Sequence, residues 1–259
     1  MMRFASLGSG SEGNALVVET GSTRILLDCG FGLRDACRRL EQKGLSAQQI
    51  DAVIVTHEHA DHLSGAARFA RHSGAALWMT HGTLQQALRT NDPLPDVRIL
   101  DSHESFAVGE LQVQPFPVPH DAREPVQFVF SDGRHRLGVL TDTGSITAHI
   151  TLMLDGCDAL VLECNHDPEL LRNSRYPPFL KQRIGGQFGH LDNSAAASLL
   201  SRIDCSRLQH LVAAHLSQQN NTPQLALNAL TQVLGCHPDW LDCATQQDGF
   251  AWRSLGAWQ

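Results

Sequence analysis

The stretch Thr56-His57-Glu58-His59-Ala60-Asp61-His62 carries the strongest indication of fold and chemistry in this chain. It places three imidazoles and a carboxylate within six residues, directly after the apolar segment Ala52–Val55. Imidazole and carboxylate are ligands that zinc, manganese and iron accept, and a sharp turn after a buried strand aims alternate residues into one cavity. We therefore expect a metal-binding loop here. A solvated histidine-rich turn is the alternative interpretation.

Three further candidate ligands each follow a separate predicted strand: His120, Asp142 and His215. A single histidine at a strand end is more often a hydrogen-bonded structural residue, but three such strand ends beside the loop favour one shared site. The expected ligand sets are His57, His59 and His120 for one ion, Asp61, His62 and His215 for the other, and Asp142 as a bridge. Two ions about 3.5–4 Å apart would share a water and lower its pKa, giving a bridging hydroxide nucleophile at neutral pH.

Length and composition allow a large core and argue against several other classes of protein. The chain has 259 residues, 42% of them hydrophobic, and a formal charge of −7. This charge excludes a generally basic surface for nucleic acid, although a local basic patch remains possible. No apolar run approaches the roughly 18 residues of a membrane span, and no signal-peptide core precedes Gly8. Seven scattered cysteines without a CxxC pair favour a reducing cytoplasm.

Hydrophobic patterning predicts alternating strands and helices in both halves of the chain. The expected strands are 3–7, 15–19, 24–27, 52–55, 75–79, 97–100, 111–117, 126–131, 136–141, 159–163 and 211–214. The expected helices are 32–43, 63–72, 81–89, 193–202 and 223–234. No low-complexity linker divides them. We therefore predict one α/β domain over residues 1–259, a four-layer αββα sandwich with two sheets face to face and helices outside.

The HxHxDH loop followed by a later His, Asp and His resembles the signature of the metallo-β-lactamase superfamily, over essentially the whole chain. The resemblance implies that Asp28 supports the metal-binding loop from behind, whereas a turn or cap aspartate is the alternative. Because His62 follows Asp61 and Asp142 takes the bridging position, the pattern is similar to glyoxalase II and to the transfer-RNA 3′-processing ribonucleases rather than to the best-known zinc β-lactamases.

Five separated motifs resemble the YycJ family, also called WalJ or VicX, whose members are regarded as cytoplasmic 5′-to-3′ DNA exonucleases. The motifs occupy residues 7–14, 162–167, 175–184, 189–193 and 215–222. One departure is Asp192, where the family pattern has serine. The resemblance implies a dinuclear metal-dependent phosphodiesterase acting on DNA. A glyoxalase II-like thioester hydrolase and a non-enzymatic metal-binding protein are the alternatives, and the metal could be Zn, Mn or Fe.

Phosphodiester hydrolysis also needs a proton for the departing oxygen. His190 is the candidate, oriented by Glu163 as the resemblance to the transfer-RNA processing enzymes implies; a helix-capping role is the alternative. Asp61 is expected to accept a proton from the attacking water while ligating metal.

The remaining candidates concern substrate and support. Arg175, Tyr176, Lys181 and Arg183 suit a nucleic-acid strand, with a solvated helical face as the alternative. Ser9, Ser11 and Asn14 offer donors to a phosphate, with a plain hairpin loop as the alternative. His166 is expected either beside Glu163 or packed under the following helix. The other histidines, including His237, have no recognisable partner pattern.

Overall fold

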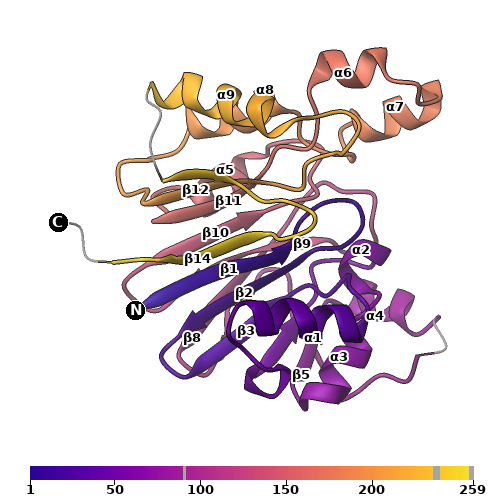
Figure 1. Cartoon of the computed structure of the whole chain (residues 1–259), viewed down its shortest axis with the longest axis vertical. Helices are drawn as coiled ribbons and strands as arrows, with labels where there is room; N and C mark the ends of the chain where they lie inside the picture. Colours follow the sequence, from indigo (N-terminus) through magenta and orange to yellow (C-terminus); the bar gives the residue numbers. More distant parts are fainter. Residues whose placement is uncertain (90–91, 236–239, 257–259) are drawn as a thin grey trace.

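Two seven-stranded sheets pack face to face at the centre of the molecule (Figure 1). The computed structural model describes residues 1–89, 92–235 and 240–256. The first sheet has the strand order β14-β1-β2-β3-β4-β5-β6, comprising β14 (Phe250–Ser254), β1 (Met2–Gly8), β2 (Ala15–Thr20), β3 (Thr23–Leu27), β4 (Ala52–Ile54), β5 (Ala76–Met79) and β6 (Val97–Ile99). The second has the order β13-β12-β11-β10-β9-β8-β7, comprising β13 (Leu241–Cys243), β12 (His210–Ala214), β11 (Ala159–Glu163), β10 (Arg136–Leu140), β9 (Val126–Ser131), β8 (Leu111–Pro117) and β7 (Phe106–Val108).

Helices cover the outer faces of both sheets (Figure 1). Those of the first half are α1 (Leu33–Gln42), α2 (Ala60–Leu63), α3 (Ala66–Ser73) and α4 (His81–Ala87), with a 3-10 turn at Ala47–Gln49. Those of the second half are α5 (Ala148–Leu154), α6 (Pro168–Asn173), α7 (Pro178–Ile184), α8 (Asn193–Leu200) and α9 (Pro223–Leu234). The predicted four-layer αββα sandwich is confirmed.

The core lies in three layers because both faces of each sheet are buried. In β11, Ala159 and Val161 face the other sheet, whereas Leu160 and Leu162 face the helices of the second half. This alternation follows from the two-residue period of a strand. It explains why the buried strands read as continuous apolar runs rather than as alternating polar and apolar residues.

Parallel pairing brings several strand ends to one edge of the sandwich. β3 pairs in parallel with β4, and β10 with β11 and β11 with β12. Within two residues of the ends of three of these strands lie non-glycine residues with left-handed φ: Asp28 (60°), Asp142 (51°) and His215 (56°). Among the described residues no other non-glycine residue has a positive φ. The sharp turns therefore coincide with the predicted site.

The structure differs from the predicted elements in a few places. The single helix expected over 63–72 is two helices, α2 and α3, with Gly65 between them. A Cβ on Gly65 would lie 1.8 Å from the carbonyl oxygen of Phe31, so the chain turns where two backbones meet. The sequence also failed to predict β7, β13, β14 and helices α5, α6 and α7.

Two expectations about the environment of the chain concern its helices and its cysteines. Every helix in the described ranges is too short or too polar to cross a bilayer. The cysteines in these ranges are free thiols, as expected for scattered residues without a CxxC pair; Cys236 lies outside the described residues.

Candidate metal centre and active site

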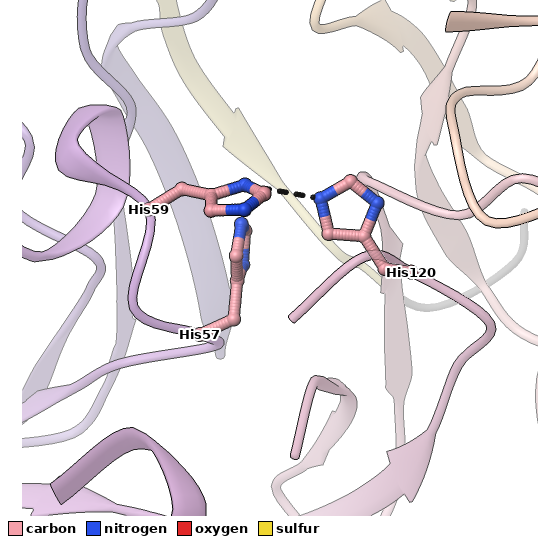
Figure 2. Close-up of side chains that lie close together, drawn as sticks. All are labelled: His57, His59 and His120. Carbon is pink, nitrogen blue, oxygen red and sulfur yellow. Dashed lines mark hydrogen bonds between the residues drawn. The ribbon is translucent and has the colours of Figure 1, made fainter. Parts of the chain in front are cut away.

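Three histidines predicted to hold one ion point toward one another (Figure 2). His57 and His59 lie in the loop between β4 and α2, and His120 lies beyond the end of β8. His120 Nε2 is 3.2 Å from His59 Nδ1, and one ligating atom of each of the three residues lies within 4.8 Å of the others. The structure therefore brings together imidazoles that are 61 residues apart in sequence.

The second predicted set also converges. His62 Nε2 lies 3.3 Å from Asp61 Oδ2, and His215 Nε2 lies 3.4 Å from the same oxygen. Asp142 lies between the two sets, because its Oδ2 is 3.3 Å from His62 Nε2 and its Oδ1 is 3.9 Å from His120 Nε2. This position is compatible with a bridging carboxylate.

Hydrogen bonds hold the Nδ1 atoms of several of these imidazoles and leave Nε2 facing the cluster. His62 Nδ1 lies 2.8 Å from Asp28 Oδ2, His120 Nδ1 donates to the carbonyl of Gly189 (3.0 Å), and His57 Nδ1 lies 3.0 Å from Thr56 Oγ1. Contacts of this kind fix the tautomer and orientation of metal-binding histidines.

Asp28 and Asn14 support the loop from behind. Asp28 Oδ1 accepts the backbone N–H of Thr56 (2.8 Å) while its Oδ2 contacts His62, as expected for a supporting residue. Asn14 Nδ2 donates to Asp61 Oδ2 (3.1 Å). Asn14, which was predicted to contact substrate, therefore has a structural contact with a candidate ligand.

Burial and charge at the centre favour a cation. Burial lowers the pKa of His62 and His215, but the negative charge of Asp142 and neighbouring carboxylates outweighs the effect of burial. The pKa of His62 is therefore raised, and the pKa of His215 is raised to about 10. Burial lowers the pKa of His57 and adjacent imidazoles lower it further. Excess carboxylate charge therefore attracts positive charge into a pocket that also holds a neutral imidazole.

His190 and Glu163 form a pair beside this cluster. Glu163 ends β11, and its Oε1 lies 2.8 Å from His190 Nδ1, while its Oε2 accepts the backbone N–H of Thr143 (3.0 Å) and of Leu191 (3.2 Å). Burial raises the pKa of Glu163, but the adjacent His190 and His215 outweigh this and hold it below its usual range. Glu163 is therefore an anion that orients His190, with His190 Nδ1 3.6 Å from Asp142 Oδ1.

Comparison with known proteins agrees with this geometry. The family model described as "Beta-lactamase superfamily domain" matches residues 23–215. Exodeoxyribonuclease YycJ of Bacillus anthracis is 33% identical over 90% of this chain and 89% of its own. The chain belongs to the metallo-β-lactamase superfamily. Exodeoxyribonuclease WalJ of Streptococcus pneumoniae serotype 2 is 31% identical over 95% of both chains. The metallo-β-lactamase fold protein YhfI of Bacillus subtilis superposes with a TM-score of 0.74 at 16% identity, covering 96% of this chain and 98% of YhfI.

The metallo-β-lactamase fold implies divalent metal binding, and the residues present fit a metal. Two buried polar atoms at the centre, His57 Nε2 and Asp142 Oδ2, have no hydrogen-bonding partner. Buried polar atoms are nearly always paired, so an unpaired imidazole nitrogen and carboxylate oxygen within one cluster indicate coordination to an ion.

The predicted substrate residues are arranged in two regions. Ser9 Oγ accepts the backbone N–H of His215 (2.9 Å), and Ser11 is exposed in the same glycine-rich loop. In the other region, Arg175 is exposed, Tyr176 is half-buried, and Lys181 Nζ donates to the carbonyl of Arg172 (2.7 Å). Their contact with substrate stays a prediction.

Arg183 and His166 have partners that the sequence did not predict. Arg183 Nε donates to Asp121 Oδ2 (2.6 Å), so its charge is already paired. His166 is buried, its backbone pairs with Asp192, and its Nδ1 lies 3.3 Å from Asn165 Oδ1. His237 lies outside the described residues.

Sequence reasoning missed Asp121. Its Oδ1 lies 3.6 Å from Nε2 of both His59 and His120. Burial raises the pKa of Asp121, but the hydrogen bond from Arg183 outweighs burial and lowers this pKa. The only sequence signal was its place directly after His120.

Proposed function

We propose that this chain is a metal-dependent phosphodiesterase that removes nucleotides from the 5′ end of DNA, with two divalent ions of Zn, Mn or Fe. The observation that carries the proposal is the convergence of seven candidate ligands from both sheets next to the Glu163–His190 pair. The names of the relatives, exodeoxyribonucleases YycJ and WalJ, support a DNA substrate. Pairing of β14 with β1 supports one domain over residues 1–259, and the free thiols support a cytoplasmic location.

The proposed ligand sets are His57, His59 and His120 for one ion and Asp61, His62 and His215 for the other, with Asp142 shared. When bound, the ions would stabilise charge on the phosphate oxygens and lower the pKa of the attacking water. Asp61 also offers a carboxylate to accept the proton of that water. Asp28, Thr56 and Asn14 hold the loop that presents these ligands.

His190 is the proposed proton donor to the departing oxygen. Because its Nδ1 is occupied by Glu163, its Nε2 is the atom left to donate. The Glu163 anion stabilises the imidazolium before the transfer and keeps the ring in one orientation. Arg175, Tyr176 and Lys181 would contact the strand beyond the scissile phosphate, with Ser9 and Ser11 as further candidates.

The direct test is hydrolysis by the purified chain loaded with manganese or zinc. We expect a 5′-labelled oligonucleotide to be degraded from its labelled end and S-lactoylglutathione to remain intact. Hydrolysis of the thioester without degradation of the oligonucleotide would replace this proposal by a glyoxalase II-like activity. Metal binding without hydrolysis of either compound would indicate a non-enzymatic protein.

The role of His190 is tested by the leaving group. Loss of a general acid typically costs about 10²–10⁴-fold in rate, but only where the leaving group needs a proton. We expect His190→Ala to reduce oligonucleotide hydrolysis by this amount and to affect a p-nitrophenyl phosphodiester far less. Equal losses on both substrates would show that His190 binds phosphate or positions a ligand instead.

A further inference from the structure

An open cavity of about 530 Å³ lies at the end of β8, where its lining includes residues that are close in sequence to the candidate metal centre. Its lining is mainly apolar and contains three aromatic rings, those of His103, His149 and Phe188, beside Pro117, Val118, Pro119 and Thr147. Pro119 directly precedes His120, and Phe188 stands two residues before His190. The cavity is therefore connected through the chain to a candidate ligand and to the proposed proton donor.

Phe188 is an exposed aromatic side chain on a firmly held backbone. Phe188 is 61% exposed, yet its carbonyl accepts the backbone N–H of Asp121 (3.0 Å). The carbonyls on either side are also bound, that of Gln187 by Ser145 Oγ (3.2 Å) and that of Gly189 by His120 Nδ1 (3.0 Å). A ring that is mostly exposed contributes little to the core, and its fixed backbone keeps it in a position to stack on a planar ligand.

Gly144 shows how closely the segment around Phe188 is packed. A Cβ on Gly144 would lie 2.4 Å from the backbone of both Gln187 and Gly189. Gly144 also donates its N–H to the carbonyl of Pro119 (2.8 Å). The two backbone walls of the cavity, at Pro119 and at Phe188, are thus fixed relative to each other and to the metal centre.

We infer that this cavity binds the nucleobase of the nucleotide adjoining the scissile phosphate, with the ring of Phe188 stacked on the base. The inference rests on the proposed function and adds a base subsite to it. The lining residues include no carboxylate, ammonium or guanidinium group, so the cavity suits a neutral planar base better than a phosphate. Its volume lies within the range of small-ligand sites. Stacking on an aromatic ring accepts any base, as an exonuclease requires.

A double-mutant cycle between side chain and base tests the inference. Wild type and Phe188→Ala, loaded with manganese, would be assayed on an intact oligonucleotide and on two matched oligonucleotides, each with an abasic residue on one side of the scissile phosphate. We expect removal of one of the two bases to lower kcat/KM of the wild type by about 5- to 150-fold, the range that stacking on an aromatic ring provides. On the intact strand, Phe188→Ala should lower kcat/KM by a similar factor. On the strand that lacks this base, Phe188→Ala should have nearly the same kcat/KM as the wild type. Phe188→Trp should retain both the activity and the dependence on the base.

Phe179 supplies the matched control. Phe179 is also exposed (72%), but it lies on α7 and is not among the residues that line the cavity. We expect the effect of Phe179→Ala to be independent of either base. The losses of kcat/KM caused by Phe188→Ala and by base removal could instead be independent, so that the two factors multiply for the base on either side of the scissile phosphate. That result would overturn the base subsite and leave the proposed nuclease activity in place. If the wild type degrades no oligonucleotide, the proposed function fails and the base subsite falls with it.

Discussion

At the scale of single residues, the candidate centre depends on strained turns that aim side chains. Asp28, Asp142 and His215 adopt left-handed φ values, which cost about 1–3 kcal/mol each for non-glycine residues. Each lies within two residues of a strand end, so the turn directs its side chain toward the cluster or its supporting contacts instead of along the sheet. The surrounding hydrogen bonds keep these conformations in place, as Asp28 illustrates through Thr56 and His62.

Asp28→Asn tests this support. Asparagine tolerates a left-handed φ, but it has only one acceptor oxygen for the N–H of Thr56 and Nδ1 of His62. We expect metal affinity to fall about 10–100-fold, measured by competition with a chromophoric chelator. Asp132→Asn is the matched control, because Asp132 Oδ2 lies 3.2 Å from His135 Nδ1 at the turn between β9 and β10. Equal losses in the two variants would contradict a specific role for Asp28.

At the scale of elements, the segment with α6 and α7 stands apart from the core. Figure 1 shows both helices at the far end of the layer formed by α8 and α9, and α7 has no buried residue. The segment carries Arg172, Arg175, Lys181 and Arg183 in a chain of net charge −7. Arg183 is paired with Asp121 and Arg172 with Glu169, so the surface available to a phosphate backbone is centred on Arg175 and Lys181.

Arg175→Ala tests this surface. A side chain that contacts one phosphate contributes about one counterion to the salt dependence of binding. We expect the slope of log affinity against log salt for a single-stranded oligonucleotide to decrease in magnitude by about 0.7. Arg134→Ala is the control, because Arg134 is exposed at the opposite end of β10 from Asp142. An unchanged slope for Arg175→Ala would remove this residue from the strand-binding surface.

At the scale of the whole molecule, the candidate centre joins the two halves of the sandwich. His57 and His59 come from the loop after β4 of the first sheet, and Asp61 and His62 from the short helix α2 that follows it. His120, Asp142 and His215 follow β8, β10 and β12 of the second. Bound ions would therefore link the two sheets at one edge and stabilise the folded state over the unfolded chain.

Thermal unfolding tests this link. At a free metal concentration 100 times Kd, binding to the folded state alone adds about 2.7 kcal/mol. We expect chelation to lower the Tm of the wild type and to abolish hydrolysis, and zinc or manganese to restore both. His59→Ala should show a smaller rise in Tm on addition of metal. If the Tm does not change on addition of metal at concentrations that restore activity, the proposal that the ions link the two sheets is contradicted.

Local sequence patterns were sufficient to predict the sandwich class, most buried strands and the seven candidate ligands. These features depend on local patterns: an apolar run long enough for one strand, followed by a ligating side chain at its end. The chemistry of the HxHxDH loop is equally local, because six consecutive residues carry it.

Contacts between residues that are distant in sequence could not be predicted in this way. β14 completes the first sheet by pairing with β1, a contact between the two ends of the chain that no local pattern encodes. Asp121 joins the site because Arg183 and two imidazoles lie against it, and Phe188 borders a cavity because its loop is bound to the turn at Asp121. Residues far apart in sequence make each of these contacts, so their distances are set by the assembled fold rather than by any single segment.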